Sequence, residues 1–142
     1  MDDPAFRSIV EEEWAKVPSP YRERIVNVAL LVEDEPDEFV REAEELEGEE
    51  TLLGIYQGLP LTERGQGYGL GETLPDTITV YRLPTLLEAG DMAKEFPEAD
   101  MKDLVRKVVR DTIWHEVGHY FGYDDLHIHR REDEGTNTFP ST

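Results

Sequence analysis

Two histidines and a glutamate stand close together late in the chain, in the run His-Glu-Val-Gly-His at positions 115–119. On a helix that advances about 100° per residue, His115 and His119 lie about 40° apart and one turn from each other. Their imidazoles can therefore converge on one zinc ion at Zn–N distances of about 2.0–2.1 Å. Glu116 lies about 60° further round than His119, too far to be a natural third ligand but close enough to reach a water on the ion. This spacing predicts two metal ligands and a general base.

A catalytic zinc site needs a third protein ligand and one open position. If the helix continued, a residue ten positions after His115 would sit about 15 Å further along its axis, so the chain must turn back. Gly122 allows such a turn, because glycine adopts a left-handed conformation without a steric penalty. Asp125 follows the turn and is the predicted third ligand, whereas Asp124 is expected to cap a final helix. Glu132 stays open as a rival ligand from downstream.

Other polar side chains near the motif have weaker assignments. Asp111 lies one turn before His115, and either accepts the second N–H of that histidine or forms a surface salt bridge with a neighbouring arginine. His127 and His129 point about 200° apart on a helix, so they cannot both bind the metal. For an oxyanion-stabilising group the sequence offers only Tyr123 or His127.

The element that must position the motif is a long helix, predicted from a cap at Asp100 to about Phe121. Its apolar residues fall between about 40° and 180° on the helical circle when Leu104 is set at 0°, and the basic residues 106, 107 and 110 are expected to face water. The three motif side chains fall inside or beside the apolar sector. Burying titratable groups is costly unless something compensates them, and a metal ion would do so. Two core histidines bonded to backbone carbonyls are the less favoured interpretation.

The rest of the chain alternates helices and strands. Apolar spacing and capping residues predict further helices over residues 6–17, 37–46, 84–96 and 124–132. Apolar runs predict strands over residues 25–32, 52–56 and 77–82. The first strand has the composition of a buried strand, and the last alternates strictly, as a half-buried strand does. The glycines of the loop at 58–75 recur every second residue, which is not a phosphate-binding spacing.

This order predicts the α/β (α+β) class, with a small mixed sheet of three or four strands packed against the long helix and no substantial C-terminal subdomain. At 142 residues the chain fits one domain, residues 1–142. The absence of cysteine excludes disulfides, a cysteine nucleophile and a thiolate metal site. The acidic start lacks the features of a signal peptide, and no segment approaches the ~18 unbroken apolar residues of a membrane span, so a cytoplasmic location is expected.

The net charge of −19 bears on the partners of the protein. Such a field repels nucleic acid backbones and anionic membrane surfaces, and it attracts cations and basic peptides. The expected partners are therefore peptide or protein substrates, with no nucleic acid and no membrane. Solubility alone is the plainer explanation of the charge.

The motif and the turn after it read His115-Glu-Val-Gly-His119-Tyr-Phe-Gly122-Tyr-Asp-Asp125. This run resembles the HExxHxxGxxD variant of the zincins, and specifically the minimal zincin-like bacterial metallopeptidase family. Segments 52–58, 75–82 and 109–112 are similar to that family as well. The resemblance implies a zincin-like fold, one zinc ion held by His115, His119 and Asp125, and Glu116 as the general base. Larger metzincins carry histidine in place of Asp125, and no methionine follows it here to form their methionine turn.

These features predict a zinc-dependent metallopeptidase. Zinc would lower the pKa of its bound water to about 7 and polarise the scissile carbonyl. Glu116 would take the proton of that water and deliver it to the leaving amine. An extended peptide would lie antiparallel to an exposed sheet edge, with 77–82 as the favoured strand and purely structural pairing as an equal alternative for it. Two other classes remain open: a metal-binding zincin-like interaction or regulatory module with little or no proteolytic activity, and a hydrolase of non-peptide amides.

Overall fold

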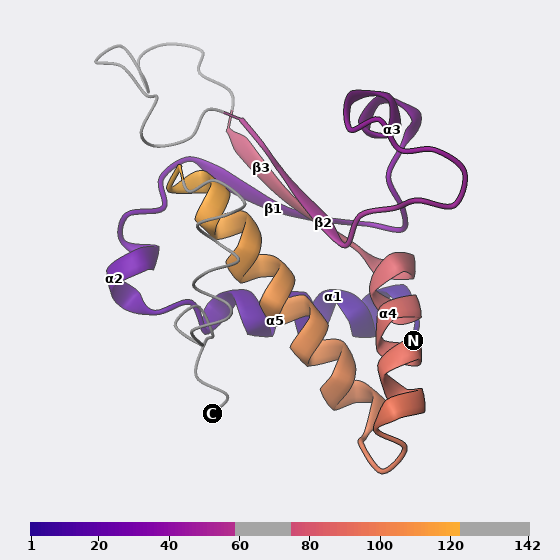
Figure 1. The fold of residues 1–142 in the computed structure, drawn as a ribbon. Coiled ribbons are helices and arrows are strands. Elements are labelled where there is room, and N and C mark those ends of the chain that lie inside the picture. Colours follow the sequence, from indigo (N-terminus) through magenta and orange to yellow (C-terminus); the bar gives the residue numbers. More distant parts are fainter. Residues whose placement is uncertain (59–74, 123–142) are drawn as a thin grey trace.

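The computed structural model of the chain describes residues 1–58 and 75–122. Its elements, in chain order, are α1 (Asp3–Ala15), α2 (Ser19–Arg22), β1 (Val28–Glu33), α3 (Glu38–Ala43), β2 (Gly54–Gln57), β3 (Asp76–Tyr81), α4 (Arg82–Glu95) and α5 (Met101–Tyr120). Helix α5 runs through the middle of the molecule and contacts α1, α4, β2 and β3 (Figure 1). No helix within these two segments is long and apolar enough to cross a membrane.

The three strands form one mixed sheet in the order β1-β3-β2. Strand β1 runs parallel to β3 with Val28 opposite Asp76, and β2 runs antiparallel to it with Gly54 opposite Val80. The predicted fold class, a small mixed sheet packed against a long helix, is confirmed. The predicted helices 6–17, 37–46 and 84–96 correspond to α1, α3 and α4, although α3 is shorter than expected. The short helix α2 was not predicted, and the predicted helix 124–132 lies outside the described residues.

Two predictions about individual strands are wrong. Strand β3 was predicted to be half-buried, but nearly all of its residues are buried. Of the two roles left open for it, an exposed edge and purely structural pairing, the structure supports pairing, because β3 is the central strand. The alternation of apolar and polar residues in β3 gives the strand two different faces, and other residues cover both of them. Val80 faces the helical core, and Tyr81 packs with Val40 of α3. Strand β1 was predicted to be buried, yet it lies at an edge of the sheet and Leu31 is 40% exposed.

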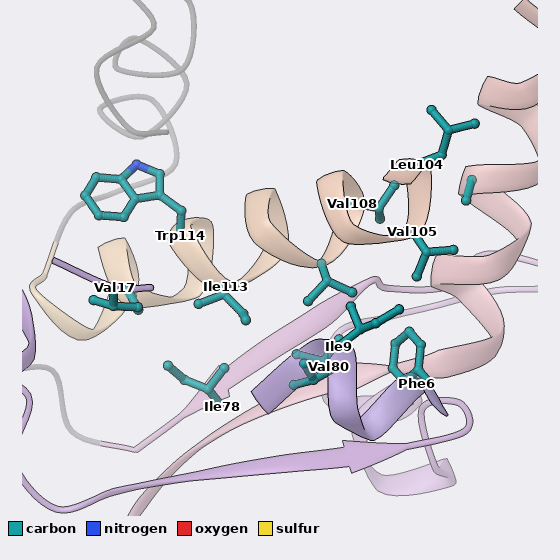
Figure 2. Close-up of a cluster of buried hydrophobic side chains, with 14 residues drawn as sticks. Phe6, Ile9, Val17, Ile78, Val80, Leu104, Val105, Val108, Ile113 and Trp114 are labelled. Carbon is teal, nitrogen blue, oxygen red and sulfur yellow. The ribbon is translucent and has the colours of Figure 1, made fainter. Parts of the chain in front are cut away.

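The main core lies between the sheet, α1 and α5. Figure 2 shows this cluster, to which α1 contributes Phe6 and Ile9, β3 contributes Ile78 and Val80, and α5 contributes Val105, Val108 and Ile113. The apolar sector predicted for the long helix is therefore confirmed. Burial of these aliphatic and aromatic side chains, at about 1.5–3 kcal/mol each, fixes α5 against β3.

The basic sector of α5 was expected to face water, and for two of its arginines this is wrong. Glu13 of α1 is completely buried and accepts hydrogen bonds from Arg110 at 2.9 Å and Arg106 at 3.3 Å, as well as from Lys16 at 2.7 Å. Burial by itself would raise the pKa of Glu13, but the hydrogen bonds from Lys16 and Arg110 outweigh it and lower that pKa. The ion pairs therefore fasten α1 to the side of α5 that the sequence pattern assigned to solvent.

Candidate metal centre

The ends of α5 are set by its own residues. The side chain of Asp100 accepts a hydrogen bond from the Lys102 amide at 2.8 Å, which caps the first turn as predicted. At the other end, the amide of Gly122 donates to the His119 carbonyl at 2.9 Å, and Gly122 has a positive φ of 88°. The helix therefore stops at Tyr120 and the chain turns at Gly122, where only glycine is free of strain. The predicted turn after the motif is confirmed.

Helix α5 brings the three motif side chains together near its C-terminal end. The imidazole rings of His115 and His119 have their centroids 5.0 Å apart, with their planes at 71°. A nitrogen of each ring and a carboxylate oxygen of Glu116 all lie within 4.8 Å of one another. Both histidines are half-buried, and Glu116 is 8% exposed. The two rings are therefore open on one side while the carboxylate is enclosed.

This donor set suits zinc. Imidazole nitrogens are common zinc ligands, and a catalytic zinc site keeps room for a third protein ligand and a water. A cavity of about 380 Å³ adjoins the motif on the side of His115 and Glu116. It is lined by Thr51, Leu52, Leu53, Gly54, Asp111, Thr112, His115 and Glu116. The predicted third ligand, its rival and the other downstream candidates lie outside the described residues: Tyr123, Asp124, Asp125, His127, His129 and Glu132.

Strand β2 holds the Glu116 carboxylate, a contact that sequence reasoning missed. The backbone N–H of Tyr56 donates to Oε1 of Glu116 at 2.8 Å. The Tyr81 amide donates to the Leu53 carbonyl across the β2–β3 ladder. In an antiparallel ladder every second residue forms hydrogen bonds with the neighbouring strand, and this series starts here at Leu53. Tyr56 and Gly54 are the intervening residues, and their N–H and C=O groups point away from β3. Glu116 therefore binds the outer edge of β2.

Gly54 allows β2 to lie directly against α5. A Cβ atom at this position would be 2.6 Å from Cγ2 of Thr112 and 2.8 Å from the carbonyl oxygen of Thr79. Real Cβ contacts are essentially never that short, so any side chain at Gly54 would push β2 away from the helix that carries the motif. The sequence signal for this close approach is a glycine at the start of a strand, which marks places where backbone comes near another element.

Asp111 forms a salt bridge, one of the two alternatives left open by the sequence. Its carboxylate accepts a hydrogen bond from Nζ of Lys107 at 2.8 Å, and both side chains are about half-exposed. The partner is a lysine one turn earlier on α5 rather than an arginine. Since pairs of this kind on exposed helix surfaces contribute only about 0.3–0.5 kcal/mol, Lys107 holds Asp111 weakly at the edge of the cavity.

Comparison with protein families matches residues 25–135 to the zincin-like metallopeptidases. A comparison with curated proteins finds no match. The matched segment covers well over half of the chain, and it includes the sheet, the cavity and the three motif residues of α5. The chain therefore belongs to the zincin-like metallopeptidase family.

Proposed function

We propose that the protein is a zinc-dependent peptidase in which His115, His119 and Asp125 bind one zinc ion and Glu116 is the general base. The observation that carries this proposal is the convergence of two half-exposed imidazoles beside a buried carboxylate, all within 4.8 Å of one another. Membership of the zincin-like metallopeptidase family supports metal-dependent hydrolysis of peptides.

Each side chain has a separate task in this proposal. When bound, zinc supplies a Lewis acid that makes a water molecule more acidic and polarises a carbonyl group. His115 and His119 each donate the lone pair of a neutral imidazole nitrogen. Oε1 of Glu116 is bonded to the Tyr56 amide, and this bond orients the carboxylate that takes a proton from the attacking water and returns it to the leaving amine.

The substrate is proposed to lie along the outer edge of β2, in place of the strand favoured from the sequence. Among the described strands β2 is an edge strand, and the amide and carbonyl of Gly54 point away from β3. An extended peptide can pair with such an edge through its own backbone. The cavity runs beside this edge from Thr51 to Glu116, so a peptide bound there passes the motif.

Replacing Glu116 with glutamine tests the proposal, because glutamine keeps the shape of the side chain and cannot accept the proton. Hydrolysis of an unstructured peptide by the zinc-loaded Glu116→Gln protein is expected to fall by about 10²–10⁴-fold. Elemental analysis is expected to find the same zinc content as in the unchanged protein. Glu95→Gln, at an exposed position at the end of α4, is the control and should change neither.

Undiminished hydrolysis by the Glu116→Gln protein would remove Glu116 from the mechanism. If the unchanged protein retains zinc but hydrolyses no peptide, the result would favour the metal-binding interaction module instead.

A further inference from the structure

The Glu116 carboxylate accepts a hydrogen bond from a backbone group that lies outside α5. The Tyr56 amide that holds Oε1 belongs to the outer edge of a short strand of only four residues, Gly54–Gln57. Edge strands of this length are easily displaced, because they have hydrogen bonds to the sheet on one side only. The orientation of Glu116 therefore depends on what fixes Tyr56.

The side chain of Tyr56 is anchored on two sides. Its hydroxyl donates to Oδ2 of Asp76 at 2.5 Å, and Asp76 is only 4% exposed. Its ring meets that of Tyr120 edge-on, with centroids 6.1 Å apart and planes at 88°. The hydroxyl of Tyr120 in turn accepts from the Val26 amide at 2.8 Å. A buried carboxylate is stable only with hydrogen-bond donors, so the Tyr56 hydroxyl and Asp76 depend on each other.

The backbone after β2 is shaped around the same carboxylate. A Cβ atom on Gly58 would lie 2.2 Å from Cγ of Asp76, and Gly58 has a φ of 149°. Only glycine lets the chain pass this close to Asp76 in that conformation. Asp76 itself is fixed at the start of the central strand, where its amide donates to the Asn27 carbonyl at 2.9 Å.

We propose that Tyr56 and Asp76 are positioning residues for Glu116. The bond between the Tyr56 hydroxyl and Asp76 joins the end of β2 to the central strand, and the Tyr56 amide then holds Oε1 of Glu116. This inference rests on the proposed function, in which Glu116 is the general base.

We expect loss of the hydrogen bond between Tyr56 and Asp76 to lower kcat and to leave KM nearly unchanged. Displacement of a reacting group by about 1 Å can cost about 10²-fold in rate, so loss of the anchor should be felt in the chemical step. Tyr56→Phe keeps the ring and the backbone amide, and removes only the hydroxyl. We expect it to lower kcat by about 10–100-fold, and to leave KM and the zinc affinity, measured by chelator competition, within about twofold. Asp76→Ala should act in the same way.

Two further variants separate positioning from general damage. Asp76→Asn keeps an oxygen that can accept from Tyr56, and it should restore most of the kcat lost in Asp76→Ala. Tyr81→Phe removes the hydroxyl of a buried tyrosine on the neighbouring strand, where the side chain packs with Val40 on the other face of the sheet. Tyr81→Phe should leave kcat unchanged.

Hydrogen exchange of the Tyr56 amide, measured in the metal-free protein, tests the positioning of Glu116 without an activity assay. In the unchanged protein this amide should be protected, because it donates a hydrogen bond to Glu116. Exchange should accelerate by at least about tenfold in Glu116→Ala and in Tyr56→Phe, and Tyr81→Phe should leave it unaltered.

The kinetic and hydrogen-exchange measurements together distinguish this inference from the proposed function. A protein with no peptidase activity, but with Tyr56 exchange that responds as expected, would overturn the function and keep the anchor. Unaltered exchange and unaltered kcat in Tyr56→Phe would overturn the positioning role. So would a fall in zinc affinity that matches the fall in kcat, since the effect would then lie in metal binding.

Discussion

At the scale of single residues, the Glu116 carboxylate is tied to the protein at an oxygen that a neighbouring strand holds. One oxygen is bonded to the Tyr56 amide, and Glu116 also lines the cavity beside His115. A carboxylate that is 8% exposed would be costly to bury without donors, so the Tyr56 amide offsets part of that cost while fixing the side chain. In the proposed role of general base, Glu116 would not have to search rotamers before each proton transfer, which is the benefit that preorganisation gives to catalysis.

The third zinc ligand is the residue-scale prediction that can be tested without an activity assay. Asp125→Ala is expected to weaken zinc binding by at least about 100-fold, because loss of even an outer-shell partner costs 10–100-fold. Glu132→Ala is expected to leave the affinity within about threefold. Both can be measured by competition with a chromophoric chelator. The opposite pattern, with a large effect only in Glu132→Ala, would assign the third ligand to the glutamate.

Sequence reasoning found the motif residues and missed their anchor for one physical reason. His115, Glu116 and His119 are brought together by the period of a single helix, which local spacing encodes. Tyr56 meets Glu116 across sixty positions of the chain, and it meets Asp76 across twenty. Such contacts depend on how strands pair, and a sequence pattern contains no direct sign of pairing. Gly54 and Gly58 are the local signs that backbone comes close to another element there.

At the scale of elements, the missing information about strand pairing also explains why the sequence favoured β3 as the exposed edge of the sheet. A strict alternation of apolar and polar residues shows that a strand has two different faces, but it does not show which strands lie beside it. Both faces of β3 are covered, and both of its edges are paired. Among the described strands, the edge next to the motif therefore belongs to β2, whose four residues carry too little pattern to be assigned an edge from the sequence.

The contact between β2 and α5 predicts the effect of adding one methyl group at Gly54. A Cβ there would be 2.6 Å from Cγ2 of Thr112, so Gly54→Ala should force β2 away from the helix and loosen the bond between Tyr56 and Glu116. Overpacking of this kind costs about 1–3 kcal/mol. We expect a loss of that size in the free energy of unfolding, measured with urea on the metal-free protein, together with a fall in kcat of the zinc-loaded protein.

Gly90→Ala is the matched control for this substitution. Gly90 lies within α4, and a Cβ at this position would meet no atom within 4 Å. Because alanine is favoured over glycine in a helix by about 0.5–1 kcal/mol, Gly90→Ala should be neutral or stabilising. If Gly54→Ala proved as stable and as active as Gly90→Ala, the close packing of β2 on α5 could not be what orients Glu116.

At the scale of the whole molecule, negative charge is concentrated next to the proposed substrate edge. Eleven of the eighteen residues from 33 to 50 are Asp or Glu, and the cavity begins immediately after them, at Thr51. Burial raises the pKa of Tyr81 to about 12, and the charges of nearby carboxylates, Glu33 and Glu116 among them, add to this effect. The acidic segment therefore leads along the chain into the strand that carries the proposed substrate edge.

This concentration of negative charge predicts that salt will affect basic substrates selectively. The net charge of −19 should speed the encounter with a peptide rich in Lys and Arg, and the Debye length falls from about 10 Å at 0.1 M salt to about 3 Å at 1 M. We expect kcat/KM for a basic peptide to fall by about tenfold over this range, because steered association is strongly screened. For an uncharged peptide with the same residues at the cleaved bond, kcat/KM should change by less than about twofold. Equal changes for the two peptides would mean that salt acts on the enzyme itself, and that the acidic segment maintains solubility without selecting the substrate.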